Sequence, residues 1–431
     1  MALSNRLNIA LLTLLAILPL GIFTVKGWAS GLSFGCAALA VVILLTRSLS
    51  QAFELDEQQT FWRRLILLTL VLPLIAAVTS SALRGVWIWA DFDAPSRFFL
   101  AAPIFYVVLR NRLQPLRYWQ YLIPIGLVLT IASTAFLPGY YGEINLFDGS
   151  RLAIYFVDPL TLGYLSLTLG ILSFFSINLF AKDTWYVVLL KLLGTALGFF
   201  ISLKTQSRTG WLAIPLILFL VLWLHGPKNK WISTVSALVV SVVLSLGIYQ
   251  ASSTVQNRFH DAMVDIQDYK LDKVNAESSI GERISYARMA LYYFKLNPIS
   301  GWGHKGFQSH INDPELVAFA TFNTRNAPGA GALFHSEIAT NSVTFGILGL
   351  IYTLLLFFAP LALFIRSWSL GKNPQLCAFG VAYILCALVS SLSTEIFALK
   401  FAASFHAVFM ACICAQVLSG MSTRRTEDLL P

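Results

Sequence analysis

The sequence has 431 residues, of which 57% are hydrophobic and only 12% carry a charge. A soluble globular protein carries about 25% charged residues, so this composition argues against an aqueous environment for most of the chain. Apolar runs of roughly 20 residues, each long enough to cross a hydrocarbon core of about 30 Å, recur along nearly the whole length. The sequence therefore predicts an all-α polytopic membrane protein.

The apolar runs divide the chain into about 12 expected membrane spans. Nine spans lie in residues 1–250 and three in residues 342–431, which also hold a short tail; residues 251–341 form one long connection. All five cysteines lie inside apolar runs without metal-ligand spacing, so we interpret them as core residues. The expected spans cover residues 7–25, 28–46, 65–83, 98–110, 118–137, 154–180, 186–203, 210–224, 231–250, 342–365, 376–394 and 401–418.

Lysines and arginines are unevenly distributed among the short connections. If the N-terminus is cytoplasmic, the cytoplasmic connections hold about twice as many of these cations as the outside ones. Because this asymmetry sets the orientation of membrane proteins, we expect both termini to be cytoplasmic. Lys191 lies inside the span at 186–203, and we expect its side chain to extend to the cytoplasm.

Two acids stand in the segment "WADFDAP" (89–95), which we expect to be an outside loop. Asp91 and Asp93 have the spacing by which metal-dependent glycosyltransferases hold a divalent ion. Two acids one residue apart are also common by chance. We therefore expect no metal site here and keep a metal site as the alternative. We find no nucleotide-binding glycine loop, zinc motif or nucleophile elbow, which argues against a nucleotide-driven pump or a soluble-type hydrolase.

Several cations lie on the expected outer side, against the overall bias. Lys204 and Arg208 crowd the tight turn "SLKTQSRTGW" (202–211), and Arg151 lies at the outer end of the span at 154–180. Charges near a membrane mark binding sites, but interfacial arginines also extend to lipid phosphates, and the residues alone leave both readings open. Guanidinium groups match phosphate bidentately and stay charged, so together these arginines suggest an anionic ligand.

The long connection has a regular pattern of its own. In "GERISYARMALYYFKL" (281–296), apolar residues recur at a helical period, at Ile284, Ala287, Leu291 and Phe294. The pattern predicts an amphipathic helix beside the membrane surface, ending in the Pro- and Gly-rich "NPISGWGHKGF". Arg283 and Arg288 are about 140° apart around this helix, so we expect them on different faces, with Arg288 solvated or ion-paired.

The connection ends in "LFHSEIATN" (333–341), just before an apolar run. A histidine at such a place is often a structural hydrogen-bonding residue, but His335 also has the ordinary properties of a general base for a hydroxyl group. The preceding "NAPGAGAL" would let the backbone approach a ligand closely. Glu337 would orient the imidazole only if the backbone is irregular, and otherwise it stands at the N-terminus of a helix.

These features, in this order, resemble the O-antigen ligase and polymerase superfamily, and within it the bacterial O-antigen ligases. The resemblance rests on "QSRTGW" (206–211), "GERISYARMALYYFKLNPISGWG" (281–303) and "HSE" (335–337), and it extends over essentially the whole chain. It implies a GT-C-like membrane fold with one large periplasmic loop containing helices. By position, Arg208 and Arg283 correspond to the family's catalytic arginines and His335 to its loop histidine. Arg151 falls where ligases carry a further outside arginine.

The resemblance also implies an activity. Such enzymes transfer O-antigen polysaccharide from undecaprenyl diphosphate to a sugar of lipid A–core, at the periplasmic face of the bacterial inner membrane. The implied mechanism is inverting and needs no metal or cofactor, with His335 as general base and with Arg208, Arg283 and Arg151 at the diphosphate. Glu337, Arg288 and Lys204 are possible supporting residues. The expected partners are the lipid-linked donor, lipid A–core and membrane lipids, with no nucleic acid.

Four other functions are compatible with the sequence. An O-antigen polymerase would use the same chemistry on a growing glycan, although polymerases have two sizeable outside loops. A protein-targeting oligosaccharyltransferase would share the same core. A transporter of lipid-linked oligosaccharide would need cations along an interior path, whereas here they gather at the outer rim. A non-catalytic assembly factor would tolerate the loss of His335.

Overall fold

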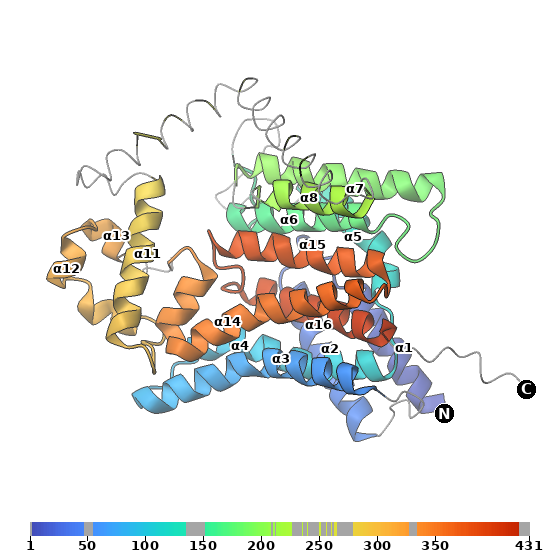
Figure 1. Cartoon of the computed structure of the whole chain (residues 1–431), viewed down its shortest axis with the longest axis horizontal. Coiled ribbons are helices and arrows are strands. Elements are labelled where there is room, and N and C mark those ends of the chain that lie inside the picture. The colour runs from blue at the N-terminus through green and yellow to red at the C-terminus, as the bar shows by residue number, and fades with distance from the viewer. Residues whose placement is uncertain are drawn as a thin grey trace, which may run out of the picture.

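The computed structural model describes residues 2–46, 55–134, 151–207, 210–211, 213–225, 279–326 and 334–421, with a few single positions between 235 and 264. In these parts the chain is helical, and the only strand-like feature is an isolated bridge between Ile154 and Val157 (Figure 1). The first helices in chain order are α1 (Ala2–Ala16), α2 (Trp28–Leu45), α3 (Glu57–Arg84), α4 (Ala90–Arg110), α5 (Leu116–Ser133), α6 (Pro159–Phe175), α7 (Trp185–Lys204) and α8 (Ala213–His225). They are followed by α11 (Ser279–Leu296), the 3-10 helix η1 (Gly306–His310), α12 (Pro314–Val317), α13 (Phe322–Asn326), α14 (Glu337–Ser369), α15 (Pro374–Ser391) and α16 (Lys400–Gly420).

Seven described helices are long and apolar enough to cross a membrane, namely α2, α3, α4, α7, α14, α15 and α16. This confirms the predicted all-α class and agrees with a multi-pass membrane protein. The total of about 12 spans stays a prediction, and residues 231–250 lie almost entirely outside the described part. The helix at the short expected span 98–110 is longer than the apolar run, because α4 begins at Ala90.

The prediction for the first span is wrong in its extent. Helix α1 ends at Ala16, and residues 17–27 form turns instead of continuing the helix to residue 25. The Trp28 ring lies over Gly21, where an added Cβ would stand 2.7 Å from it, and the indole Nε1 donates to the carbonyl of Ile17 at 3.2 Å. The turn is thus closed by a side chain that a hydropathy pattern does not register.

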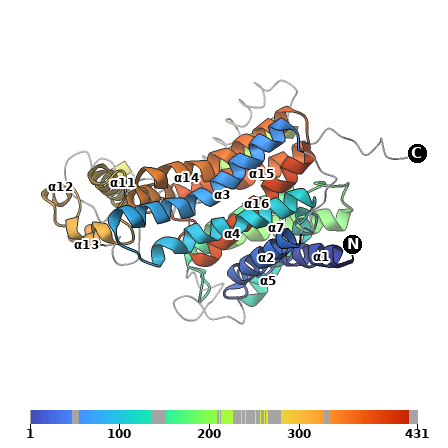
Figure 2. The same cartoon turned by 90° about the horizontal axis from the view of Figure 1, so that it is seen from below.

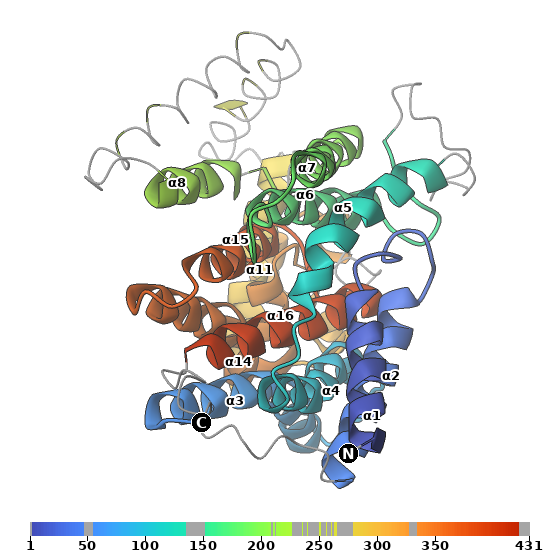
Figure 3. The ribbon, with the colours of Figure 1, turned by 90° about the vertical axis from the view of Figure 1, so that its right-hand side faces the viewer.

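Helix α16 lies at the centre of the bundle and is buried along almost its whole length. It packs against α4, α2, α14 and α3, and the end-on view in Figure 3 shows it enclosed by these neighbours. The Trp119 ring of α5 stacks on Phe409 of α16, with ring centroids 4.2 Å apart. Helix α3 runs alongside both α4 and α14 (Figure 2).

The expectation for Lys191 is also wrong, because the side chain is fully buried and does not reach solvent. Its Nζ donates to Asp183 Oδ2 at 2.7 Å, to Gln120 Oε1 at 2.9 Å and to the carbonyl of Ser176 at 2.7 Å. A buried ammonium is stable only when its charge and its donors are matched. Lys191 therefore anchors the loop between α6 and α7 to the inside of the bundle.

Helices α11, α12 and α13 form a separate layer at one end of the bundle (Figure 1). The predicted helix is confirmed as α11, and its place beside the membrane surface stays a prediction. The layer has a small apolar core of its own, which includes Phe334 immediately before α14. The α11 residues in this core are Tyr286, Met289, Ala290 and Tyr293, whereas Ala287 and Leu291 are exposed.

A break in α14 attaches this layer to the bundle. Gly346 has φ +64° and ψ −147°, a conformation open to glycine only. The interrupted helix leaves the carbonyls of Val343 and Thr344 to accept the amides of Trp302 and Gly303, both at 2.9 Å, while the Ile347 amide donates to Pro298 at 2.7 Å. Backbone groups of residues 298–303 thereby replace the helical bonds that the break removes.

Candidate active site

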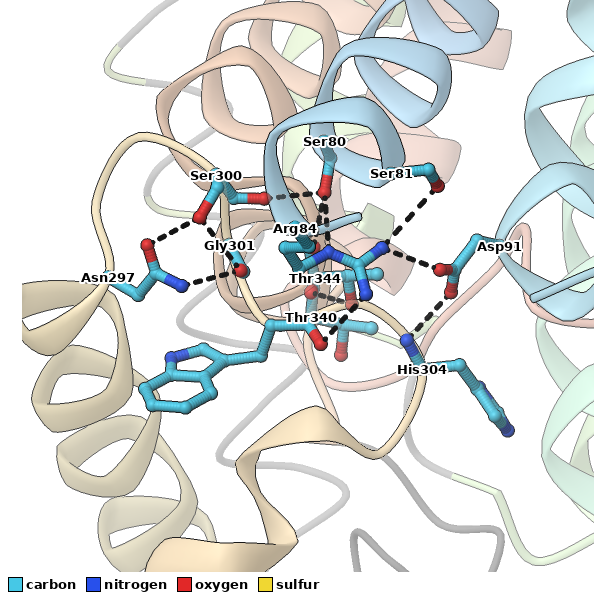
Figure 4. A network of polar contacts seen from close by, with 11 residues as sticks. Ser80, Ser81, Arg84, Asp91, Asn297, Ser300, Gly301, His304, Thr340 and Thr344 are labelled. Carbon is cyan, nitrogen blue, oxygen red and sulfur yellow. Dashed lines mark hydrogen bonds and ion pairs between the residues drawn. The ribbon is translucent and has the colours of Figure 1, made fainter. Parts of the chain in front are cut away.

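A polar network surrounds the attachment of residues 297–304 to the ends of α3 and α4 (Figure 4). Arg84 Nη2 contacts Asp91 Oδ2 at 2.8 Å, and the two side chains are 11% and 0% exposed. The guanidinium also donates to the carbonyl of Trp302 at 3.3 Å, and Asp91 Oδ1 accepts the amide of His304 at 2.7 Å. The pair thus holds two successive parts of the same loop.

Gly303 is required by this arrangement. Its φ is +64°, and an added Cβ would stand 2.1 Å from Nη1 of Arg84. The loop backbone can therefore pass the guanidinium only where no side chain is present. Asp91 and Asp93 belong to the first turn of α4, so the prediction of a loop around them is wrong.

His335 stands at the start of α14 in a left-handed conformation, with φ +50°. Left-handed backbone is unfavourable for a residue with a Cβ and persists only where the surroundings impose it. The preceding Phe334 is buried, with its ring centroid 5.3 Å from that of Phe307. The imidazole itself is half-buried and lies beside Tyr286 of α11, with ring centroids 5.1 Å apart.

A short chain of hydrogen bonds restrains the backbone next to His335. The Phe334 amide donates to Thr340 Oγ1 at 3.3 Å, and that hydroxyl donates to Glu395 Oε1 at 3.0 Å. Thr340 lies in the first turn of α14, and Glu395 lies in the connection between α15 and α16. The position of His335 therefore depends on a residue 60 positions later in the chain.

Tyr286 is a neutral phenol beside the imidazole. Burial, together with the charges of Glu282 and Glu395, raises the pKa of Tyr286 above its usual value. Arg283 lies three residues earlier on α11, at the helical spacing that makes side chains neighbours. The structure thus brings the helix that carries Arg283 next to His335, as a site built from both residues requires.

Arg283 and Arg288 are both exposed, and on the continuous helix α11 they lie about 140° apart around the axis. Both border one open hollow of about 410 Å³, together with Ile284, Ala287 and Leu291. The Arg288 guanidinium lies 4.1 Å from the centroid of the Phe319 ring. The predicted apolar stripe of α11 therefore exists, but it faces outward between two arginines.

Arg208 lies outside the described residues. The two other cations of that region are brought together at the end of α7. Arg151 is exposed, and its Nε donates to the carbonyl of Thr205 at 3.1 Å, while the neighbouring Leu152 amide donates to the carbonyl of Lys204 at 2.9 Å. Residues 151–152 are thus fastened to the C-terminal end of α7 at residues 204–205.

Glu337 is buried in the first turn of α14. Its Oε1 accepts from Asn341 Nδ2 at 2.7 Å, and its Oε2 accepts the amide of Phe397 at 3.0 Å. The carboxylate thus ties the start of α14 to the segment before α16, and these bonds point it to groups other than the imidazole of His335.

A cavity of about 200 Å³ lies at the same end of the bundle, between α3, α4, α14 and the segment before α16. It is lined by Asp91, Asp93, Glu337 and Glu395, with an apolar wall that includes Phe98 and Tyr352. Asp91 is paired with Arg84, and Asp93 with Lys400 at 2.9 Å. In the part of the chain that the structure describes, no group of three His, Cys, Asp or Glu residues could hold a metal ion.

Sequence reasoning missed Tyr286, Thr340 and Glu395 as neighbours of His335. Tyr286 stands three residues after Arg283 in the segment of the resemblance, which was the one available signal. The contacts of Thr340 and Glu395 arise from folding and leave no local pattern.

Known proteins are similar to this chain in sequence. Residues 193–354 match a family model described as O-antigen ligase. The chain is 23% identical over 306 residues to an uncharacterised protein of Haemophilus influenzae, covering 68% of this chain and 72% of that protein. It is also 23% identical over 249 residues to an O-antigen ligase of Escherichia coli, covering 57% of this chain and 58% of that ligase. These matches confirm the resemblance to the O-antigen ligase superfamily.

Proposed function

We propose, from this place in the O-antigen ligase superfamily, that the protein transfers O-antigen polysaccharide from undecaprenyl diphosphate to a sugar hydroxyl of lipid A–core. The reaction would take place at the periplasmic face of the bacterial inner membrane, with residues 251–341 as the periplasmic loop and both termini in the cytoplasm. The observation that carries the proposal is the contact between His335 at the start of α14 and Tyr286 of α11, one turn from Arg283.

The chemistry has two demands that these residues fit. The acceptor hydroxyl is a weak nucleophile, and His335 as general base would remove its proton, an effect worth typically 10²–10⁴-fold in rate. The diphosphate leaving group gains negative charge, and Arg283 with Arg208 would stabilise it, since removing one such donor costs about 10²–10³-fold. Attack from the side opposite the diphosphate inverts the anomeric carbon, and the route needs no metal or cofactor.

The exposed face of α11 fits the donor's two parts. Arg283 and Arg288 offer guanidinium donors to a diphosphate, while Ala287 and Leu291 between them offer an apolar surface to the lipid chain. Arg151 and Lys204 add positive charge at the C-terminal end of α7, shortly before Arg208 in the sequence. Glu337 supports the start of α14 through its bonds to Asn341 and Phe397.

Glycan transfer by purified variants tests the proposal. His335→Ala and Arg283→Ala should each lower transfer at least 10²-fold. Lys295→Ala removes a cation from the last turn of the same helix and should leave transfer unchanged. Wild-type transfer by the His335 variant would refute the assignment.

A competition assay separates the ligase from its nearest alternative. Purified protein receives undecaprenyl-diphosphate glycan together with equal amounts of lipid A–core and free glycan. A ligase yields capped lipid A–core, whereas an O-antigen polymerase yields a ladder of longer glycans. A chelator should leave the activity intact, and its loss would favour a metal site at Asp91 and Asp93 instead.

A further inference from the structure

A second polar cavity lies at the end of the bundle opposite His335. It has a volume of about 430 Å³ and opens between the connection of α4 to α5, the loop after α6, the start of α15 and the end of α16. The charged residues in its lining are Arg112 and Arg117, and no acid lines it. The other polar lining residues are Gln114, Asn373, Gln375, Gln416 and Ser419.

Gln416 shows that this cavity is suited to an acceptor group. The side chain is only 5% exposed, and its Oε1 accepts the amide of Leu116 at 3.0 Å. With Oε1 held in that bond, the amide Nε2 of the same side chain is a hydrogen-bond donor at the wall of the cavity. An amide donor can bind an oxygen of a ligand there.

Charge at this end of the bundle favours an anion. The Arg117 guanidinium lies 5.7 Å from the centroid of the Phe180 ring, which forms part of the same wall. The acid nearest in sequence to that wall, Asp183, is neutralised by Lys191 at 2.7 Å. Two arginines and a buried amide donor match the oxygens of a phosphate group.

An apolar cavity of about 470 Å³ adjoins the polar one. The two share Pro374 and Gln375, and the walls of the second are formed largely by Phe174, Phe175, Ile177 and Ala378. The combined space is therefore basic at one end and apolar at the other. It lies where α4, α6 and α16 end and α15 begins, and the ends of membrane helices are where lipid headgroups are met.

We propose that this double cavity binds an anionic membrane phospholipid. Its phosphate would lie between Arg112 and Arg117 with Gln416 as a third donor, and an acyl chain would occupy the space beside Phe174 and Ala378. The site is remote from His335 and does not depend on the proposed transferase activity.

Lipid binding to delipidated protein in detergent tests the proposal, measured by native mass spectrometry over a lipid titration. Phosphatidylglycerol should bind at one saturable site, and phosphatidylcholine, whose headgroup has no net charge, at least about tenfold more weakly. Arg112→Gln with Arg117→Gln should weaken phosphatidylglycerol binding about tenfold or more, from the loss of two charged hydrogen-bond donors. The matched control is Arg64→Gln with Arg366→Gln, two arginines that do not line the cavity, and it should bind like wild type.

Gln416→Glu provides an independent variant, because it keeps the acceptor for the Leu116 amide and replaces the buried donor by a carboxylate. It should retain the wild-type melting temperature in detergent and lose phosphatidylglycerol binding. Equal weakening in the Arg64 and Arg366 control would overturn the proposal in favour of diffuse charge attraction. Equal affinity for both lipids, or displacement of the lipid by millimolar inorganic phosphate, would overturn the claim of a phospholipid site.

Discussion

Breaking the pair of Arg84 and Asp91 should release the attachment of α11 to the bundle. The perturbation is Asp91→Asn, which leaves the guanidinium, 11% exposed, without its counter-charge. Removing one partner of a buried ion pair costs about 3–5 kcal/mol. Because the pair holds residues 302–304, the free energy required to open this loop locally falls by the same amount. A cost of 3 kcal/mol or more raises the open population by about 10²-fold or more.

Limited trypsin digestion measures this opening at Lys305, the residue after the clamped His304. Cleavage follows the open population when opening and closing are fast compared with proteolysis. Asp93→Asn is the matched control, since it makes the same change two residues away in a pair whose side chains are 65% and 41% exposed. An exposed pair contributes about 0–1 kcal/mol, so cleavage in the control should rise by no more than about fivefold.

Two outcomes would show that the reasoning is wrong. One is equal cleavage at Lys305 in the Asp91 and Asp93 variants. The other concerns the double variant Arg84→Met with Asp91→Asn, which removes both charges and keeps an oxygen that can accept the His304 amide. It should be cleaved more slowly than Asp91→Asn, because no charge is left buried and unpaired, and faster cleavage would refute the account.

Three further changes test other parts of the same region. Thr340→Val removes both the acceptor for the Phe334 amide and the donor to Glu395; it should destabilise the start of α14 by about 1–3 kcal/mol in thermal unfolding, whereas Thr340→Ser should not. Gly346→Ala should lower the melting temperature, because its Cβ would meet the carbonyl of Pro298 at 2.6 Å with φ at +64°; Gly31→Ala, in open space, should not. The hydrogen bond from Tyr292, with His310 beside it, lowers the pKa of Asp313. At pH values above the ordinary aspartate pKa of about 3.9, this contact therefore stabilises α12. The stabilisation is lost as the pH falls through the lowered pKa. Hydrogen exchange in α12 should therefore stay slow to a lower pH in wild type than in Tyr292→Phe, and identical profiles would contradict this.

The membrane helices could be predicted from the sequence because hydrocarbon demands a long apolar run with its backbone bonds satisfied inside one segment. The run at 28–46 became α2, and that at 376–394 became α15, each within a few residues. The predicted extent of the first span was wrong because Trp28 folds back over Gly21 and closes a turn. A hydropathy pattern measures apolar length and is blind to such a contact.

Helix α11 shows what a periodic sequence pattern can predict and what it cannot. Its period predicted a helix correctly, but this segment is apolar on two sides, and period alone does not say which side becomes buried. Packing against Phe307 and Phe334 selected the side with Tyr286 and Tyr293. The stripe with Ala287 and Leu291 was left facing outward.

By itself, the sequence determined the chemical class of this protein. Its apolar runs require a membrane, and its "GER" and "HSE" segments carry the resemblance to O-antigen ligases through residue identity alone. Only the tertiary structure decided which partner each charged or polar group has, bringing Asp91 to His304, Lys191 to Asp183 and Thr340 to Glu395. The physical reason is that burying a polar group requires a matching partner, and nothing in the local sequence says from which helix that partner comes.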